Sequence, residues 1–184
     1  VQGSPSGIAM ILLNEERQNH IIQVYGANRA DAASMASDAR DVLEDADILM
    51  LQLETPMEAS VEAARAAKAL GVLVVWDPAP AESPPEEMVG LADLLAPNQT
   101  EAEALTGFAV NDLQSAERAA AALLGMGAVS VVVKLAELGA FYAGPEGRGH
   151  VPPLPAEPTD TVAAGDAFGA ALAVAMAEGH PLKE

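Results

Sequence analysis

Short apolar runs alternate along the chain with longer stretches in which apolar residues recur every three or four positions. The first pattern predicts buried strands and the second predicts helices. Predicted strands occupy residues 7–13, 20–24, 47–53, 72–76 and 129–135, and the apolar residues 91–95 lead into Pro97. Predicted helices occupy residues 31–43, 56–70 and 112–126, and two more begin at Thr100 and near Ala164.

Prolines and glycines mark the ends of several of these elements. Pro56 opens a helix whose end is followed by Gly71, and residues 78–85 are a loop rich in Pro and Ala. Residues 140–151 are predicted to form a hairpin with its turn at residues 144–147. Near-continuous apolar strands that alternate with helices predict an α/β fold, with a mainly parallel sheet covered on both faces.

Polar residues follow the predicted strands at the points where the strands end. Glu54, Asp77 and Asn98 each come after an apolar run, and the segments 134–139 and 160–166 also follow strands. Ligands of open parallel sheets bind beyond the carboxyl ends of the strands. The shared placement therefore predicts a ligand site at that edge of the sheet.

The segment DTVAAGDAF, residues 160–168, places the carboxylate of Asp166 among small residues at the start of an apolar helical pattern. Ala163, Ala164 and Gly165 let a ligand approach the backbone, and the unpaired N–H groups of a first helical turn attract an anion. Asp166 would then be a base toward a hydroxyl beside that anion. The alternative is that Asp166 only favours the start of a buried helix electrostatically.

Composition excludes several other classes of function. The net charge is −18 with nine Lys and Arg among 184 residues, which argues against nucleic acid or an anionic membrane as partner. Cysteine is absent, which excludes thiolate metal sites and fits a cytoplasmic protein. The longest apolar run, residues 167–177, is shorter than the roughly 20 residues of a membrane span.

DTVAAGDAF resembles the C-terminal signature of the ribokinase-like carbohydrate kinases of the phosphofructokinase-B type. The segments PSGIAMILLNEERQNHIIQVYGAN, LMLQLETP, VVWDPAPA and APNQTEAEALTG are similar to that family in the same order, nearest to the bacterial ribokinases. The resemblance covers nearly all of the chain. It implies a ribokinase-like three-layer α/β/α fold, with part of a small β lid at residues 1–28 and a partial kinase domain at residues 29–184. Because the family's N-terminal and C-terminal segments are missing from the pattern, we expect a partial sequence that is inactive alone.

The resemblance implies ATP-dependent phosphorylation of a sugar hydroxyl, with conversion of D-ribose to ribose 5-phosphate as the expected reaction. It makes Asp166 the base and sugar-binding carboxylate, with the backbone N–H groups of Ala163, Ala164 and Gly165 as the anion hole. It also places Glu54 against the sugar. The nucleotide-binding residues that it implies are Asn98, Lys134, Leu135, Ala136, Glu137, Leu138, Gly139 and Gly165.

Two metal ions follow from the same resemblance. Glu101 helps to hold Mg²⁺ through water, and Asp160 with the carbonyl of Val162 binds a monovalent cation, K⁺. Asn98 and Glu101 also have the spacing of a helix cap with a reciprocal glutamate, and a cap and a ligand contact can coexist. Sugar and ATP are the expected small-molecule partners, and family members that pair through their lids imply a homodimer.

The chain departs from the family pattern at Lys134 and Ala136, where a Thr and a Gly are typical. Lys134 either contacts phosphate or faces solvent. Three other functions stay open: another sugar or nucleoside kinase of the family, a non-catalytic nucleotide- or sugar-binding relative, and a structural domain whose acidic surface serves association. The retained Asp166 and its Ala-Ala-Gly turn favour catalysis.

Overall fold

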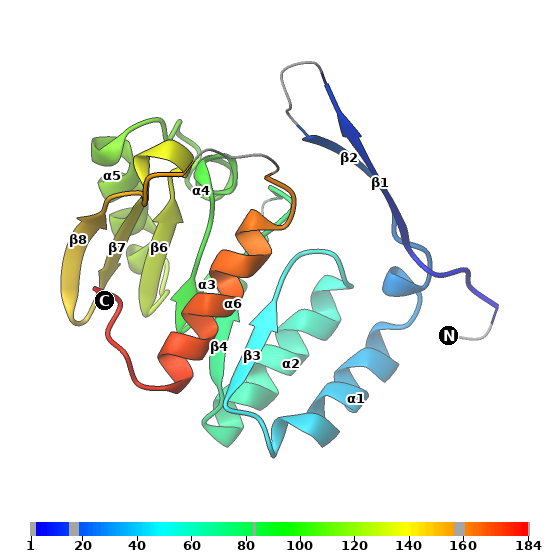
Figure 1. The fold of residues 1–184 in the computed structure, drawn as a ribbon. Coiled ribbons are helices and arrows are strands. Elements are labelled where there is room, and N and C mark those ends of the chain that lie inside the picture. The colour runs from blue at the N-terminus through cyan, green and yellow to red at the C-terminus, as the bar shows by residue number, and fades with distance from the viewer. Residues whose placement is uncertain (1–2, 15–18, 83, 157–160, 184) are drawn as a thin grey trace.

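The computed structural model describes residues 3–14, 19–82, 84–156 and 161–183. A six-stranded sheet with the order β3-β4-β5-β6-β7-β8 forms the centre (Figure 1). Strands β3 to β6 are parallel, and β7 and β8 run antiparallel to their neighbours, which confirms the predicted mainly parallel α/β sheet. The strands are β3 (Ile48–Leu51), β4 (Leu73–Trp76), β5 (Leu94–Leu95), β6 (Ser130–Lys134), β7 (Ala140–Gly144) and β8 (Gly147–Val151).

Helices connect these strands, and local side-chain chemistry sets several of their ends. The Asp31 carboxylate accepts a hydrogen bond from the first turn of α1, and Gly71 closes α2 in the left-handed conformation that glycine tolerates. The helices are η1 (Gly26–Arg29), α1 (Ala32–Leu43), α2 (Met57–Leu70), α3 (Glu86–Leu91), α4 (Gln99–Thr106), α5 (Leu113–Gly125), η2 (Ala136–Leu138) and α6 (Ala164–Ala177). The sequence patterns predicted the long helices but not α3.

The two faces of the sheet carry alternate residues of each strand, as the pleat requires. Trp76, Leu95 and Val133 pack in one buried cluster with residues of α2, α3, α4 and α5. Val75 and Leu94 point the other way and pack against Ala173 of α6. The result is three layers, with α6 on one face of the sheet and the other helices on the opposite face (Figure 1).

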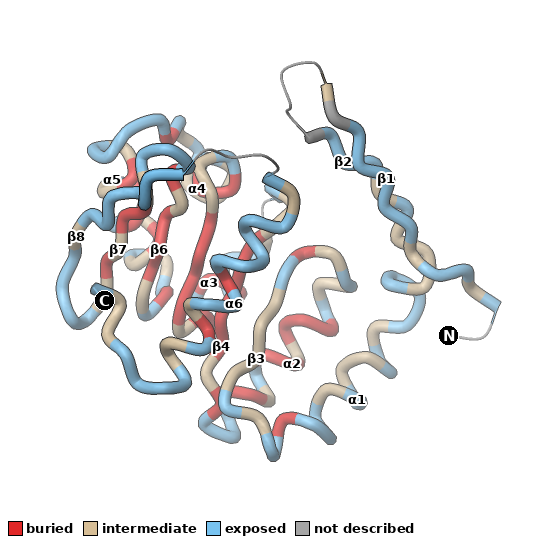
Figure 2. Tube along the Cα trace, in the orientation of Figure 1, coloured by how far each residue is buried: buried red, intermediate tan, exposed pale blue. Residues whose placement is uncertain are grey.

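Helix α6 is covered on one side only. Its buried residues are Gly169 and Ala173, whereas Val174 is 58% exposed. Figure 2 shows the same division along the helix. A buried helix was expected here, and that expectation is wrong for the described chain, because only the stripe of small residues meets the sheet. A Cβ atom at Gly169 would lie 3.6 Å from Cε of Met50, so α6 sits close to β3.

Strand β3 was also predicted to be buried, and its four residues are only half-buried. The reason is its place in the sheet, since β3 pairs with β4 and stands at the end of the described strand order. Among the described residues, no helix is long and apolar enough to cross a membrane.

A separate antiparallel ribbon is formed by β1 (Ile8–Leu13) and β2 (Asn19–Val24). Ile8 pairs with Val24 and Met10 with Ile22, so these four side chains share one face, and each is more than half exposed. In Figure 1 the ribbon stands apart from the sheet, beyond the end of α2. It falls inside the range predicted as a lid segment, and the division of the chain into lid and kinase domain stays a prediction.

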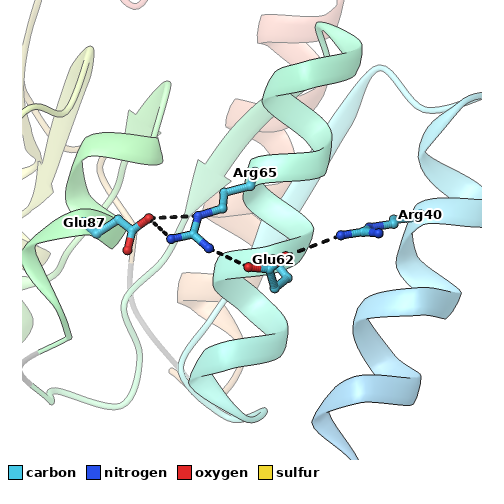
Figure 3. Close-up of polar contacts among 4 residues, drawn as sticks. All are labelled: Arg40, Glu62, Arg65 and Glu87. Carbon is cyan, nitrogen blue, oxygen red and sulfur yellow. Dashed lines mark hydrogen bonds and ion pairs between the residues drawn. The ribbon is translucent and has the colours of Figure 1, made fainter.

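An exposed chain of ion pairs joins the first three α-helices (Figure 3). Arg65 of α2 bonds to Glu87 of α3 and to Glu62 on its own helix, and Glu62 also pairs with Arg40 of α1 at 3.4 Å. Exposed pairs of this kind contribute little to stability, because water and salt screen their charges. The network lies outside the candidate site.

Candidate active site

Three neighbouring strands end at the same edge of the sheet and bring polar residues together. Asp77 directly follows β4, Lys134 is the last residue of β6, and Asn98 follows the strand between them. Asn98 forms an isolated parallel bridge with Lys134, which extends the pairing of β5 and β6 by backbone contacts. This is the carboxyl edge at which the sequence predicted a ligand site.

Asp77 and Lys134 form a nearly buried ion pair. Nζ of Lys134 donates to Oδ2 of Asp77 at 2.6 Å, and the two side chains are only 15% and 12% exposed. The structure therefore rules out the solvent-facing alternative for Lys134. Sequence reasoning found Asp77 only as a residue after a strand, because nothing in the pattern indicates a partner 57 positions away.

Asn98 and Glu101 form a capping box at the start of α4, as their spacing predicted. The Glu101 carboxylate accepts hydrogen bonds from the backbone N–H of Asn98 at 2.7 Å and from its Nδ2 at 2.8 Å. Burial raises the pKa of the Glu101 carboxyl, opposed by the Asn98 backbone hydrogen bond and by Lys134. Each carboxylate oxygen accepts one bond from Asn98 and keeps a further lone pair for another partner.

The first turn of α6 lies beside this cluster. Ala163 precedes the helix with a φ of 60°, and no side chain caps the helix there. Ala164, Gly165 and Asp166 are exposed, so a ligand has access to their backbone. A Cβ atom at Gly165 would lie 3.9 Å from Nζ of Lys134, and one at Gly169 would lie 3.9 Å from Oδ2 of Asp77. The predicted anion hole and the ion pair are therefore neighbours.

Glu54 belongs to a second polar group, between the ribbon and the sheet. Nε2 of Gln23 on β2 donates to Oε1 of Glu54, and the hydroxyl of Tyr25 donates to Oε1 of Gln23 at 3.0 Å. These residues line a cavity of about 150 Å³ together with Gly7, Ile8, Ala9, Val24 and Asn28. Sequence reasoning missed Gln23 and Tyr25, because their strand pattern carries no signal for this contact.

The loop after β6 has a conformation fixed by its own backbone. The N–H of Leu135 donates to the carbonyl of Gly139 at 2.8 Å, and the Leu135 side chain is fully buried in the core. Gly139 has a φ of 84°, and a Cβ atom there would lie 2.2 Å from the carbonyl oxygen of Val151, so only glycine fits. Of the predicted nucleotide-binding residues in this loop, Leu135 can offer only its backbone. Ala136, Glu137 and Leu138 are exposed.

The predicted metal sites are only partly visible. Asp160 lies outside the described residues, and Val162 is half-buried just before α6. Within the described ranges, no group of three or more His, Cys, Asp and Glu side chains could hold a metal ion. The described side chains therefore do not form a metal site by themselves.

Comparison with known proteins gives a consistent set of matches. A family model for the pfkB family carbohydrate kinases matches residues 1–184. The ribokinase of Staphylococcus aureus is 37% identical over 163 residues, which are 89% of this chain and 54% of that protein. The ribokinase of Arabidopsis thaliana is 36% identical over 190 residues, covering 100% of this chain and 50% of that protein.

Solved structures give the same result for the fold. The structure of Arabidopsis thaliana ribokinase complexed with ribose and ATP has a TM-score of 0.85 at 32% identity, covering 98% of this chain and 59% of that chain. The ribokinase of Thermotoga maritima has a TM-score of 0.81 at 36% identity, covering 96% and 58%. The chain spans about half the length of the curated relatives that it matches.

Proposed function

Because the chain belongs to the pfkB family of carbohydrate kinases, we propose that its protein transfers the γ-phosphoryl group of ATP to a sugar hydroxyl, with D-ribose as the sugar. The product would be ribose 5-phosphate. Similarity to ribokinases supports the choice of sugar, and the Arabidopsis thaliana relative is known in complex with ribose and ATP.

The chemistry that we propose centres on the first turn of α6. Asp166 takes the proton of the attacking sugar hydroxyl, the new O–P bond forms, and the bond to the ADP oxygen breaks. The backbone N–H groups of Ala163, Ala164 and Gly165 stabilise the charge that develops on the transferred phosphoryl group. Phosphoryl transfer depends mainly on positioning and electrostatic stabilisation, which an uncapped helix start can supply.

The site has one polar group around Glu54 and another around Asn98 and Lys134, and we assign the first to the sugar and the second to the nucleotide. Glu54, with its partner Gln23, would hold sugar hydroxyls in the cavity beneath the ribbon. Asn98 and the loop of residues 134–139 would hold the nucleotide. Mg²⁺ would neutralise charge on the phosphates, and Glu101, held in place by its hydrogen bonds from Asn98, would help to hold it through water.

The observation that carries this proposal is the exposed Asp166 in an uncapped first helical turn at the carboxyl edge of the sheet, next to Gly165, which lies beside Lys134. A non-catalytic relative would bind nucleotide or sugar without turnover, so turnover is the measurement that separates the two functions.

The test is a kinase assay with the full-length gene product. ATP and Mg²⁺ are supplied with ribose, 2-deoxyribose, adenosine or fructose 6-phosphate, and ADP release is followed with K⁺ or Na⁺ at the same ionic strength. We expect the highest kcat/KM with ribose, and faster turnover in K⁺. Nucleotide binding without turnover on any of these substrates would favour the non-catalytic function.

A further inference from the structure

The Asp77–Lys134 pair is costly as a purely structural feature. The pair is nearly buried, and Oδ1 of Asp77 is buried without a hydrogen-bond partner among the described residues. Desolvation of two charges offsets most of their attraction, and an unpaired buried oxygen adds a further cost. Unsatisfied polar atoms of this kind call for an explanation beyond stability.

The location of the pair supplies that explanation. Lys134 lies against Gly165, and Asp77 lies against Gly169, so the two charges flank the start of α6. Two further carboxylates, Glu101 and Asp166, belong to the same candidate site, and the whole protein carries a net charge of −18. A phosphate that approaches this turn is repelled by several negative charges. The Lys134 ammonium lies beside the turn and offsets part of that repulsion.

We propose that Asp77 is a positioning residue, which holds the Lys134 ammonium beside the first turn of α6 so that this cation meets the terminal phosphate of the nucleotide. The inference rests on the proposed kinase function. A free lysine side chain has many rotamers, and fixing one of them in advance lowers the entropy lost on phosphate binding. Asp77 thus acts through Lys134 and does not touch substrate itself.

Three variants of the full-length gene product test the pair. Lys134→Met replaces the lysine by an uncharged side chain of similar length. Asp77→Asn replaces the carboxylate by an uncharged amide of nearly the same shape, and the double variant removes both charges. We expect Lys134→Met to lower kcat/KM for ATP by about 30–100-fold, the scale of a charged phosphate contact. Asp77→Asn should lower it about 3–10-fold, and the KM for sugar should stay within twofold of the wild-type value in both.

The double variant is the decisive measurement. If Asp77 acts only through Lys134, the double variant should match Lys134→Met, because nothing remains for Asp77 to hold. It also leaves no unpaired buried charge, so it is expected to fold even where a single variant does not. A folded double variant with wild-type kcat/KM for ATP would overturn the inference. So would a double variant whose fold-loss in kcat/KM equals the product of the losses of the two single variants.

A second readout works without turnover. Lys134→Met should weaken binding of a non-hydrolysable ATP analogue at least tenfold more than binding of ADP, because only the analogue carries the terminal phosphate. Equal weakening of both nucleotides would overturn the inference. Since this measurement needs no sugar, it tests the pair even if the wild-type protein phosphorylates none of the substrates and the proposed function fails.

The chain offers a matched control at the opposite edge of the sheet. Lys68 and Asp93 form an ion pair at 2.5 Å, and Asp93 precedes β5, whereas Asp77 follows β4. Asp93→Asn should therefore leave kcat/KM for ATP and the affinity for the analogue unchanged. A loss as large as that of Asp77→Asn would mean that any broken Lys–Asp pair impairs the protein, and the positioning role would be lost.

Discussion

At Asp166, a catalytic base and a helix-start charge differ in what their loss would change. Asp166→Asn is nearly isosteric, and Asn is tolerated near a helix start. If Asp166 is the base, the substitution should lower kcat by about 10²–10⁴-fold, with the melting temperature and most of the nucleotide affinity kept. A purely electrostatic role predicts a loss of about 0.3–1 kcal/mol in stability with turnover per folded molecule unchanged. Measuring the melting temperature and kcat on one preparation separates the two.

Glu101 gives a second prediction at the scale of a residue, because its pKa is raised above the ordinary value of 4.5, chiefly by burial. The native state then holds the Glu101 proton to higher pH than the unfolded chain does. The free energy of unfolding therefore falls as pH rises from the unfolded pKa through the native one. Glu101→Gln keeps an acceptor for the cap and removes this dependence.

Urea unfolding between pH 4 and pH 8 measures this difference. The wild-type stability, relative to Glu101→Gln, should decline with rising pH by about 1.4 kcal/mol per unit of pKa shift, and should then level off. Asp112→Asn, at the exposed cap of α5, is the matched control, because Ser115 lowers the pKa of that carboxyl and the dependence should have the opposite sign. Parallel stability curves for the wild type and Glu101→Gln would contradict the burial argument.

Single residues were predictable from sequence where the chemistry is local. The capping box of Asn98 and Glu101 depends on neighbours three positions apart, so spacing alone indicated it. The Asp77–Lys134 pair joins two strands separated by another, and only the sheet order brings them together. The contact of Gln23 with Glu54 joins the ribbon to the loop after β3, 31 positions along the chain, which no local pattern encodes.

At the scale of elements, the seating of α6 on the sheet leads to a prediction at Gly169. A Cβ atom there meets Met50 at an ordinary contact distance of 3.6 Å. Gly169→Ala should therefore stabilise the protein by about 0.5–1 kcal/mol, since glycine weakens a helix interior. Gly169→Leu should destabilise it by about 1–3 kcal/mol, because a larger side chain must push α6 away from β3.

Denaturant unfolding of both variants checks these signs. Ala170→Leu is the control, because Ala170 is the next residue along α6 and is exposed. That substitution should change the free energy of unfolding by less than about 0.5 kcal/mol. If Gly169→Leu proves as harmless as Ala170→Leu, the close seating of α6 is wrong.

Element types were predictable where the apolar pattern was long, and less so where it was short. Helix α3 was missed because the Pro-rich stretch before it indicated a loop, although Pro85 suits a helix start and Glu86 and Glu87 suit its first turn. The apolar pattern of α6 predicted a helix correctly but not its exposure. The apolar periodicity of a segment indicates that it is helical. How much of the helix surface is covered depends on which other elements pack against it in the fold.

At the scale of the whole molecule, the exposed apolar face of the ribbon predicts self-association. Ile8, Met10, Ile22 and Val24 form an exposed apolar face on two strands, and such faces are typical of association sites. We expect the full-length gene product to be a homodimer through this ribbon. The double substitution Met10→Lys with Ile22→Glu places opposite charges on a cross-strand pair, so the ribbon should survive while the dimer is lost.

Sedimentation velocity at several protein concentrations measures this change. Val42→Lys is the control, because Val42 of α1 is also exposed, at 68%, and lies away from the ribbon. That variant should keep the wild-type oligomeric state. A wild-type protein that is monomeric at tens of micromolar, or a ribbon variant that still dimerises, would contradict the prediction.

The order of strands in the large sheet has a consequence for how the protein is made. Each strand from β3 to β8 lies next to the strand that precedes it in the chain, and none is inserted between two earlier ones. As the ribosome releases the chain from its N-terminus, each emerging strand finds its pairing edge already formed. The strands from β3 to β8 can therefore pair one after another in the order in which they are translated, and the segment of α6 emerges after all of them.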